Sequence, residues 1–191
     1  KKSGLVVVHE QGRDAVSEAF RVIRSNLDFM LSKKGEVQSI MFTSFNPGSG
    51  KTFISANLSV ALALAGKRVI LLEMDIRKGS AKSEDGTVPA GITNYLSGKV
   101  SGIRDIIRKS EWHDTLDVIT SGPVPPNPAE LLLSNRLDML MEELRREYDF
   151  ILIDTVPYGV VADAQVINRI ADLCIYVIRE GRFDRRLLPD V

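Results

Sequence analysis

Short apolar runs alternate along this chain with stretches whose apolar positions recur every three or four residues. The runs have the length and continuity of strands buried on both faces, and the recurring positions indicate amphipathic helices. The predicted strands are 37–43, 69–72, 116–120, 150–153 and 173–178, and the predicted helices are 15–31, 53–65, 92–96, 103–107, 128–148 and 163–170. This alternation predicts an α/β fold, a doubly wound, mostly parallel sheet with helices on both faces.

Local signals refine these boundaries. Gly66 is suited to end the second helix, and Asn127 with Pro128 is suited to begin the fifth, which should run to about Tyr148 with Leu132, Leu133, Leu137, Leu140, Met141 and Leu144 facing inward. Residues 78–90 are polar and predict a mobile loop, and residues 5–8 predict either a short edge strand or an extended arm.

Composition narrows the possible classes of protein. The 191 residues fit one domain, and a net charge of zero gives no general attraction to nucleic acid or anionic lipid. The single cysteine, Cys174, excludes an internal disulfide framework, and its apolar surroundings predict a buried strand residue. No apolar stretch is long enough to span a membrane. The start at Lys1 and the end at Val191 suggest a piece cut from a longer parent.

A glycine-containing segment, 44–52, joins the strand 37–43 to the helix that follows and ends in Gly-Lys-Thr. Glycines let the backbone approach an anion, and the helix N-terminus favours phosphate. We expect Lys51 to reach the β- and γ-phosphates of a nucleotide and Thr52 to hold Mg²⁺. An ordinary strand-to-helix turn is the less favoured alternative, although Phe45 stands where the full Walker A pattern has glycine. The predicted nucleotide-binding residues are Pro47, Gly48, Ser49, Gly50, Lys51, Thr52 and Phe53.

Carboxylates follow two of the predicted strands. Asp154 ends the run 150–153 in the manner of a Walker B acid, and Glu73 and Asp75 follow the run 69–72. Their alternation places Glu73, Asp75 and Arg77 on one face. Two carboxylates near Mg·ATP suggest that one holds the metal and the other accepts a proton from an incoming hydroxyl. A loop-capping aspartate and a solvated acidic loop are the alternatives.

Several motifs together resemble the bacterial tyrosine kinases (BY-kinases), P-loop regulators of capsule and exopolysaccharide export. The matching segments, in chain order, are the Glu-x-x-Arg-x-x-Arg motif of Glu18, Arg21 and Arg24, the Walker A segment 43–52, the Walker A′ segment 71–78, the stretch 125–132 and the Walker B segment 151–155. The combination covers nearly the whole chain and is more specific than any one motif.

The resemblance implies an enzyme that transfers phosphate from ATP to tyrosine, with ATP and Mg²⁺ as cofactors. Its catalytic residues would be Lys51, Glu73, Asp75 and Asp154, and its metal ligands Thr52, Asp75 and Asp154. Glu73 would take the proton from a tyrosine hydroxyl, whose ordinary pKa of about 10 makes it a poor nucleophile at neutral pH.

The resemblance also implies partners. Glu18, Arg21 and Arg24 would lie at the interface of a ring-shaped homo-oligomer, in which one subunit phosphorylates its neighbour's tail. A membrane-bound polysaccharide co-polymerase segment, fused or separate, and a tyrosine phosphatase are further expected partners. The chain would then act at the cytoplasmic side of the bacterial inner membrane, with no nucleic acid involved.

Some positions depart from the family pattern. Glu73 stands where the family usually has Asp, and Val156 replaces the first proline after Walker B. The tyrosines are scattered rather than clustered, so we expect these residues not to include the tyrosine-rich tail that serves as substrate in the family; they are Tyr95, Tyr148, Tyr158 and Tyr176.

Two other functions compete with the kinase. A switch ATPase of the ParA/MinD type would carry a signature lysine at the position of Asn46, which counts against it. A non-catalytic ATP-binding regulator of polysaccharide polymerisation is compatible with Glu73 at the base position. Without the family resemblance, the Glu18, Arg21 and Arg24 face would be read as a solvated helix surface with a weak ion pair.

Overall fold

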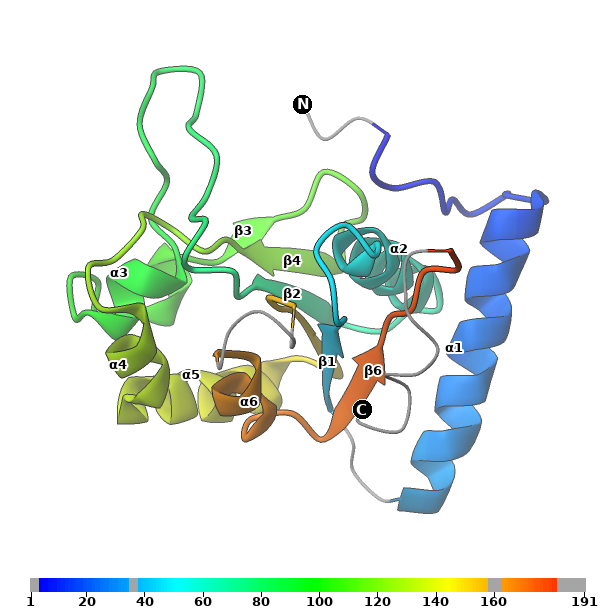
Figure 1. The fold of residues 1–191 in the computed structure, drawn as a ribbon. Helices are drawn as coiled ribbons and strands as arrows, with labels where there is room; N and C mark the ends of the chain where they lie inside the picture. Colours follow the sequence, from blue (N-terminus) through cyan, green and yellow to red (C-terminus); the bar gives the residue numbers. More distant parts are fainter. Residues whose placement is uncertain (1–3, 35–37, 158–162, 182–191) are drawn as a thin grey trace.

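A six-stranded sheet forms the centre of the computed structural model, which describes residues 4–34, 38–157 and 163–181 (Figure 1). The strands, in their order across the sheet, are β3 (Arg108–Lys109), β4 (Leu116–Ile119), β2 (Val69–Glu73), β5 (Phe150–Asp154), β1 (Ser39–Thr43) and β6 (Leu173–Tyr176). Every pairing is parallel except that between β3 and β4. This arrangement confirms the predicted doubly wound sheet.

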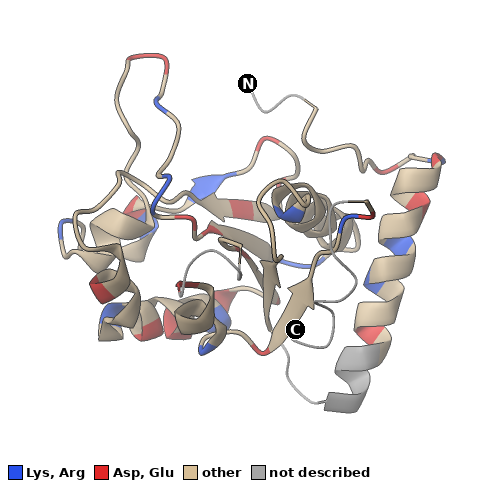
Figure 2. Cartoon of the chain, viewed as in Figure 1, with Lys and Arg blue, Asp and Glu red and all other residues tan. Residues whose placement is uncertain are grey.

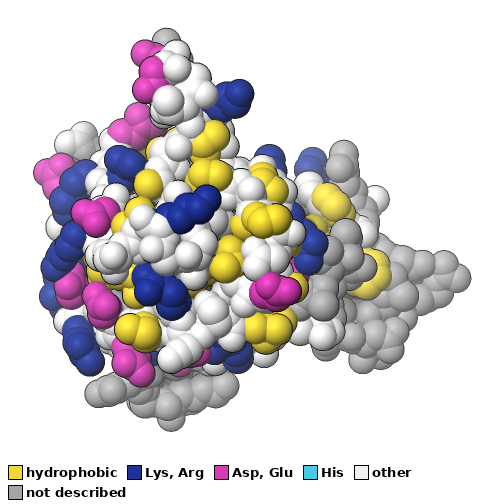
Figure 3. Space-filling model, turned by 90° about the vertical axis from the view of Figure 1, so that its left-hand side faces the viewer, with side chains coloured by type: hydrophobic (Ala, Val, Ile, Leu, Met, Phe, Trp, Pro, Cys, Tyr) yellow, Lys and Arg dark blue, Asp and Glu magenta, His cyan; other side chains and the backbone are white. Residues whose placement is uncertain are grey.

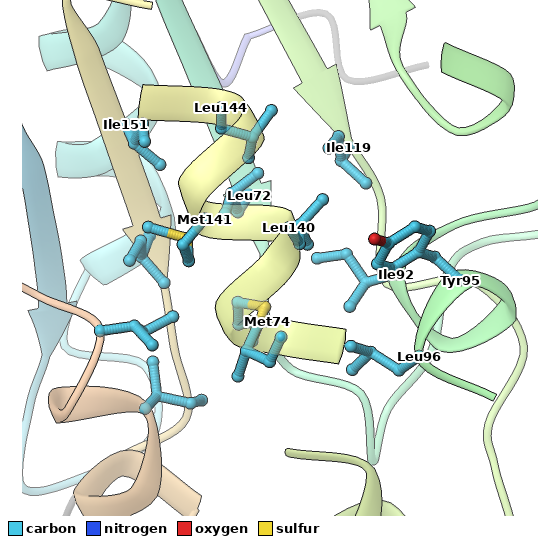
Figure 4. Packing of buried hydrophobic residues seen from close by; sticks show 14 of the residues in the cluster. Leu72, Met74, Ile92, Tyr95, Leu96, Ile119, Leu140, Met141, Leu144 and Ile151 are labelled. Carbon is cyan, nitrogen blue, oxygen red and sulfur yellow. The ribbon is translucent and has the colours of Figure 1, made fainter. Parts of the chain in front are cut away.

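Helices cover both faces of the sheet (Figure 1). One face carries α1 (Ala15–Lys34) and α2 (Lys51–Leu64), and the other carries α3 (Ile92–Leu96), α4 (Pro128–Leu133), α5 (Asn135–Glu147) and α6 (Asp163–Asn168). Neighbouring strand residues alternate between the two layers: Ile40 and Phe42 belong to the core under α2, and Met41 to the core under α5. Figure 4 shows the second core, in which α5 places Leu140, Met141 and Leu144 against the sheet.

The helix α2 begins at Lys51, two residues earlier than predicted, so Lys51 and Thr52 belong to its first turn. Gly50 precedes it with a φ of 99°, a left-handed conformation that glycine adopts without strain. At the other end the N–H groups of Gly66 and Lys67 bond the carbonyls of Ala63 and Leu62, at 2.9 and 3.2 Å. These two bonds form a Schellman motif and confirm Gly66 as the end of the helix.

The predicted helix over 128–148 is wrong in one respect, because it is broken at Ser134. Ser134 has extended backbone angles, φ −69° and ψ 147°, so α4 ends before it and α5 begins after it. The break turns Leu133, predicted to face inward, outward, with 63% of its surface exposed. The predicted helix at 103–107 is also only partly right: residues Ile103–Asp105 form a 3₁₀ turn that leads into β3.

Cys174 is exposed, not buried as predicted. It lies in β6, which is the last strand of the sheet order and therefore has a sheet neighbour on one side only among the described residues. The apolar run around it is typical of a central strand, but an edge position leaves part of the strand uncovered.

Residues 5–8 form an extended arm rather than a strand. The fully buried Asn57 of α2 holds the arm: its Oδ1 accepts from the N–H groups of Val7 and Val8, at 2.8 and 3.1 Å, and its Nδ2 donates to the carbonyl of Leu5 at 2.9 Å. An amide that satisfies three backbone groups at once takes the place of a strand partner.

The polar segment 79–90 projects from the body of the protein (Figures 1 and 3). At its base the N–H of Ser80 bonds the carbonyl of Gly122 at 2.9 Å, and the N–H of Gly122 bonds Ser80 Oγ at 2.8 Å. The predicted loop is thus confirmed, while its predicted mobility stays a prediction.

Acidic and basic residues are interspersed over the ribbon in Figure 2, consistent with the zero net charge. No helix within the described ranges has both the length and the apolar character required to cross a bilayer. Tyr158, the chain ends at Lys1 and Val191, and the side chains of the last turn of α1 lie outside the described residues.

Candidate functional site

A pocket of about 470 Å³ opens at the carboxyl ends of β1, β2 and β5, the edge where ligands bind in open parallel sheets. It brings together seven of the residues that the sequence predicted for the site: Pro47, Gly48, Lys51, Thr52, Glu73, Asp75 and Asp154. Three segments far apart in the sequence therefore meet at one place, the phosphate loop, the end of β2 and the end of β5.

The phosphate loop presents a desolvated ammonium group to this pocket. Lys51 is only 8% exposed, and its Nζ donates to Ser44 Oγ at 3.1 Å. Burial lowers the pKa of Lys51, and the charges of Asp154 and Asp75 partly oppose that shift. A cation that has already lost much of its water is well placed to interact strongly with phosphate oxygens.

The end of β5 places Asp154 beside the first turn of α2. Thr52 Oγ1 donates to Asp154 Oδ2 at 2.6 Å. Burial raises the pKa of Asp154 to about 6, against the lowering effects of the Thr52 hydrogen bond and of Lys51, and the charges of Glu73 and Asp75 raise it further. Its second oxygen, Oδ1, is buried without a hydrogen-bond partner among the described residues.

This unpartnered oxygen is a test of whether the residues fit a metal ion. A buried carboxylate oxygen that no donor satisfies is costly, and a cation would relieve that cost. Carboxylate and hydroxyl oxygens are hard ligands of the kind Mg²⁺ prefers, and Mg²⁺ usually completes its shell with water and phosphate. In the described part of the chain no three His, Cys, Asp or Glu residues form a metal site by themselves. Thr52, Asp75 and Asp154 therefore fit a Mg²⁺ ion that is shared with a nucleotide.

Of the Walker A′ carboxylates, Glu73 is the last residue of β2 and Asp75 lies on the turn that follows it. Met74 and Ile76 are buried, whereas Glu73 and Asp75 line the pocket, which confirms the predicted alternation. Arg77 does not line the pocket with them, although the alternation suggested the same face. Its guanidinium instead forms an ion pair with Asp163 of α6, and that pair draws the arginine away from the nucleotide site.

Three of the predicted nucleotide-binding residues lie beside the pocket rather than in its wall. Gly50 is the N-cap of α2, Ser49 donates its hydroxyl to the carbonyl of Asn46, and the Phe53 ring packs against Phe20 with ring centroids 6.1 Å apart. Any contact of Phe53 with phosphate would therefore come from its backbone N–H group.

Sequence reasoning missed Ser121, which also lines the pocket. Its Oγ donates to the carbonyls of Glu73 and Asp75, at 2.8 and 3.2 Å, and so fixes the backbone at both of these residues. The available signal was its position just after the strand 116–120, at the same edge of the sheet.

The predicted interface residues lie on α1, away from the pocket. Arg21 pairs with Glu18 at 2.8 Å and also donates to the carbonyl of Gly12, while Arg24 donates to the carbonyl of Ala61 in α2 at 3.3 Å. The weak intrahelical pair anticipated for this face is thus present. Both arginines already have partners within the chain, and a role between subunits stays a prediction.

Comparisons with known proteins agree with this geometry. A family model described as an AAA domain matches residues 37–183. The tyrosine-protein kinase YwqD of Bacillus subtilis is 39% identical over 183 residues, which cover 94% of this chain and 75% of that protein. The chain belongs to the bacterial tyrosine kinases. As a member of this family it is also similar to the putative tyrosine-protein kinase CapB of Staphylococcus aureus, at 38% identity over 93% of this chain and 78% of CapB.

Solved structures of this family share its fold. The chimerical protein CapA2B2 has a TM-score of 0.85 at 36% identity, covering 97% of this chain and 81% of that one. The kinase domain of the Escherichia coli tyrosine kinase ETK has a TM-score of 0.79 at 34% identity, covering 88% and 65%. The cell-division ATPase MinD of Pyrococcus furiosus, at 24% identity and a TM-score of 0.57, shares the fold alone. The P-loop fold that these proteins share binds a nucleotide together with a divalent metal ion.

Proposed function

We propose that this chain is an ATP-dependent protein-tyrosine kinase that regulates the synthesis and export of capsular or exopolysaccharide. The observation that carries the proposal is that Glu73 and Asp75 line the same pocket as Lys51, Thr52 and Asp154. A simple nucleotide switch needs a phosphate loop and a Walker B acid, whereas two further carboxylates can supply both a metal ligand and a base. The names of the similar proteins support the same activity.

Each group of site residues has its own task in this reaction. Residues 47–53 bind the ATP phosphates, with Lys51 on the β- and γ-phosphates, and Thr52, Asp75 and Asp154 hold Mg²⁺. Bound Mg²⁺ would neutralise charge on the phosphate oxygens. Glu73 accepts the proton of a tyrosine hydroxyl while the tyrosine oxygen bonds the γ-phosphorus and the bond to the ADP oxygen breaks. Glutamate has one methylene more than the usual aspartate and keeps the carboxylate.

The wider setting of this activity is also part of the proposal. Residues 1–191 act as a single P-loop kinase domain that assembles into a ring of copies, each phosphorylating a neighbour's tyrosines. A polysaccharide co-polymerase segment, fused or separate, holds the ring at the cytoplasmic side of the inner membrane, and a tyrosine phosphatase reverses the modification. Two relatives support a link to further segments: CapA2B2 is a chimerical protein, and in the Escherichia coli kinase Etk the matched region is only 23% of the protein.

The first test is phosphotransfer to tyrosine. The chain is incubated with Mg·ATP and a peptide that holds several tyrosines, and phosphotyrosine is measured by mass spectrometry. We expect phosphotyrosine that disappears when EDTA removes Mg²⁺, because Thr52, Asp75 and Asp154 then have no ion to hold against the phosphates.

Other products would point to the other candidate functions. Phosphate release without phosphotyrosine would favour a ParA/MinD-like switch ATPase. ATP binding with neither product would favour a non-catalytic regulator of polysaccharide polymerisation. Either result would overturn the proposal that this chain is a tyrosine kinase.

Replacing Glu73 separates base catalysis from nucleotide binding. We expect Glu73→Gln to lower kcat for tyrosine phosphorylation about 100-fold and to leave ATP affinity nearly unchanged, because the amide cannot accept the proton. Glu73→Asp restores the carboxylate and should recover most of the rate. Steady-state kinetics on both variants check this, and equal rates for Glu73→Gln and wild type would exclude Glu73 as the base.

The α1 motif is tested through assembly. Changing Glu18, Arg21 and Arg24 together to Ala should dissociate the oligomer in sedimentation velocity and lower phosphorylation between subunits several-fold. A matched control changes Glu142 and Arg146, charged residues on the surface of α5, to Ala and should leave assembly intact. If the α1 variant keeps both assembly and activity, these residues are a solvated helix face.

A further inference from the structure

The end of β2, which carries Glu73, and the turn after it, which carries Asp75, are held by contacts with three other segments. The N–H of Met74 donates to the carbonyl of Asp154 at 2.8 Å, which fixes the turn against β5. Ser121 Oγ donates to the carbonyls of both acidic residues, which fixes it against the end of β4. The third contact is an ion pair between the side chains of Arg77 and Asp163. It is the one of these three contacts that reaches a helix, because Asp163 is the first residue of α6.

This ion pair has the geometry of a strong interaction. Arg77 Nε lies 2.5 Å from Asp163 Oδ2, and a terminal nitrogen of the same guanidinium lies 2.9 Å from Oδ1, so the contact is bidentate. The Asp163 side chain is only 4% exposed, whereas that of Arg77 is 44% exposed. A carboxylate buried to this degree needs a partner, and the planar guanidinium is suited to supply it. Arg77 is therefore held in one orientation.

That orientation bears on the nucleotide site. Arg77 is two residues beyond Asp75 on the same turn, and it interacts electrostatically with Asp75. Neither Arg77 nor Asp163 lines the pocket, so any effect of the pair on the site must act through the turn. What the pair can do is set the direction in which the turn leaves β2, and hence where the carboxylate of Asp75 lies relative to Thr52 and Asp154.

We propose that Arg77 and Asp163 are positioning residues that hold the Walker A′ turn so that Asp75 can share a Mg²⁺ ion with Thr52 and Asp154. The inference rests on the proposed nucleotide site and extends it to two residues outside the pocket. Groups that orient metal ligands in this way commonly affect metal affinity or rate by 10- to 100-fold.

The test measures metal affinity directly, apart from phosphotransfer. Binding of the fluorescent analogue mant-ATP is titrated with Mg²⁺ in wild type and in Asp163→Asn, which keeps the size of the side chain and removes its charge. We expect the Mg²⁺ midpoint to rise about tenfold in the variant. Arg77→Lys keeps the positive charge but loses the bidentate contact, so an intermediate shift is expected.

A matched control separates positioning from general stability. Asp138→Asn breaks the ion pair between Asp138 and Arg169, near the other end of α6, and should leave the Mg²⁺ midpoint unchanged. All titrations are made well below the melting temperature of each variant, so a loss of stability alone would not move the midpoint. If Asp163→Asn does not fold, Arg77→Lys decides the question.

Unchanged Mg²⁺ midpoints in folded Asp163→Asn or Arg77→Lys would overturn the inference and leave the pair a structural link only. This outcome differs from failure of the proposed function, which would appear as absent phosphotyrosine in wild type while mant-ATP still binds with Mg²⁺.

Discussion

Replacing Lys51 with Met is expected to lower the rate of tyrosine phosphorylation by about 10³-fold or more. The ammonium group lines the pocket at the start of α2, where it would lie against the β- and γ-phosphates. Negative charge on these oxygens changes during transfer, and a fixed cation in a water-poor site stabilises that change strongly. Methionine has a similar length and no charge, so this stabilisation is lost.

The variant should nevertheless fold. Lys51 is buried and its pKa is lowered by that burial, so its charged form is held in the native state at a cost. An uncharged side chain of similar length removes this cost, although Asp154 loses a favourable neighbour. We expect the melting temperature without nucleotide to change by only a few degrees.

The matched control for this experiment is Lys67→Met. Lys67 follows the same helix at its other end and is exposed, so the change removes the same charge without touching the pocket. Kinetics, mant-ATP binding and thermal unfolding of both variants are compared with wild type. Equal loss of activity in both variants, or none in Lys51→Met, would contradict the role given to Lys51.

The parts of this site that the sequence predicted are those that depend on local order along the chain. A strand, a glycine turn and a helix follow one another at 39–64, so residue order placed Lys51 and Thr52 next to the helix N-terminus, although the helix begins two residues earlier than predicted. The alternation after β2 likewise separated buried Met74 from Asp75 in the pocket wall. In these segments the local sequence pattern and the tertiary structure agree, as they generally do in natural proteins.

The parts that were missed depend on contacts between distant segments. Apolar spacing continues across Ser134, so periodicity could not show that the chain extends there and turns Leu133 outward. Cys174 lies in an apolar run, and only the sheet order reveals that its strand is at an edge. Asn57 and Ser121 bond backbone groups of other segments; the position of Ser121 after a strand indicates its edge of the sheet, but the sequence around neither residue identifies its partners.

Asp154→Asn should abolish most of the activity while making the nucleotide-free protein more stable at neutral pH. Asp154 Oδ1 is buried without a partner among the described residues, and burial raises the pKa of this carboxyl to about 6. The amide keeps an oxygen that can accept from Thr52 and carries no charge to desolvate, but it is a poor substitute for a carboxylate that binds Mg²⁺. We expect the rate of phosphorylation to fall about 10³-fold.

The sign of the stability effect follows from proton linkage. Because the pKa of Asp154 is higher in the folded protein, the native state binds the proton more tightly than the unfolded chain does. The bound proton therefore stabilises the folded protein. This stabilisation is complete below the ordinary carboxyl pKa of about 4, decreases as the pH rises, and is lost above about 6. A shift of about two pKa units corresponds to at most about 3 kcal/mol, so Asp154→Asn should raise the free energy of unfolding by about 1–3 kcal/mol at pH 7.5 and by roughly a third as much at pH 4.5, where the carboxyl is ionised mainly in the unfolded chain.

Asp172→Asn supplies a control of opposite sign. Asp172 is also partly buried, but Arg145 and the N–H groups of Ser39 and Gln38 outweigh that burial and hold its pKa well below the usual range. Neutralising it should therefore destabilise the protein at pH 7.5 and at pH 4.5 alike, because stabilisation from a lowered pKa is lost only as the pH falls below the ordinary pKa of about 4. Urea unfolding of the three proteins at pH 4.5 and 7.5 measures both effects.

The comparison is completed by adding Mg·ATP at pH 7.5. Wild type should gain stability from the bound nucleotide, whereas Asp154→Asn should gain much less, because mass action stabilises only the form that binds the ligand. A variant that is less stable than wild type without nucleotide, or that gains as much from Mg·ATP, would show that Asp154 is not a strained metal ligand. If both expectations hold, the carboxylate is kept in the fold at a cost in stability because the nucleotide site requires it.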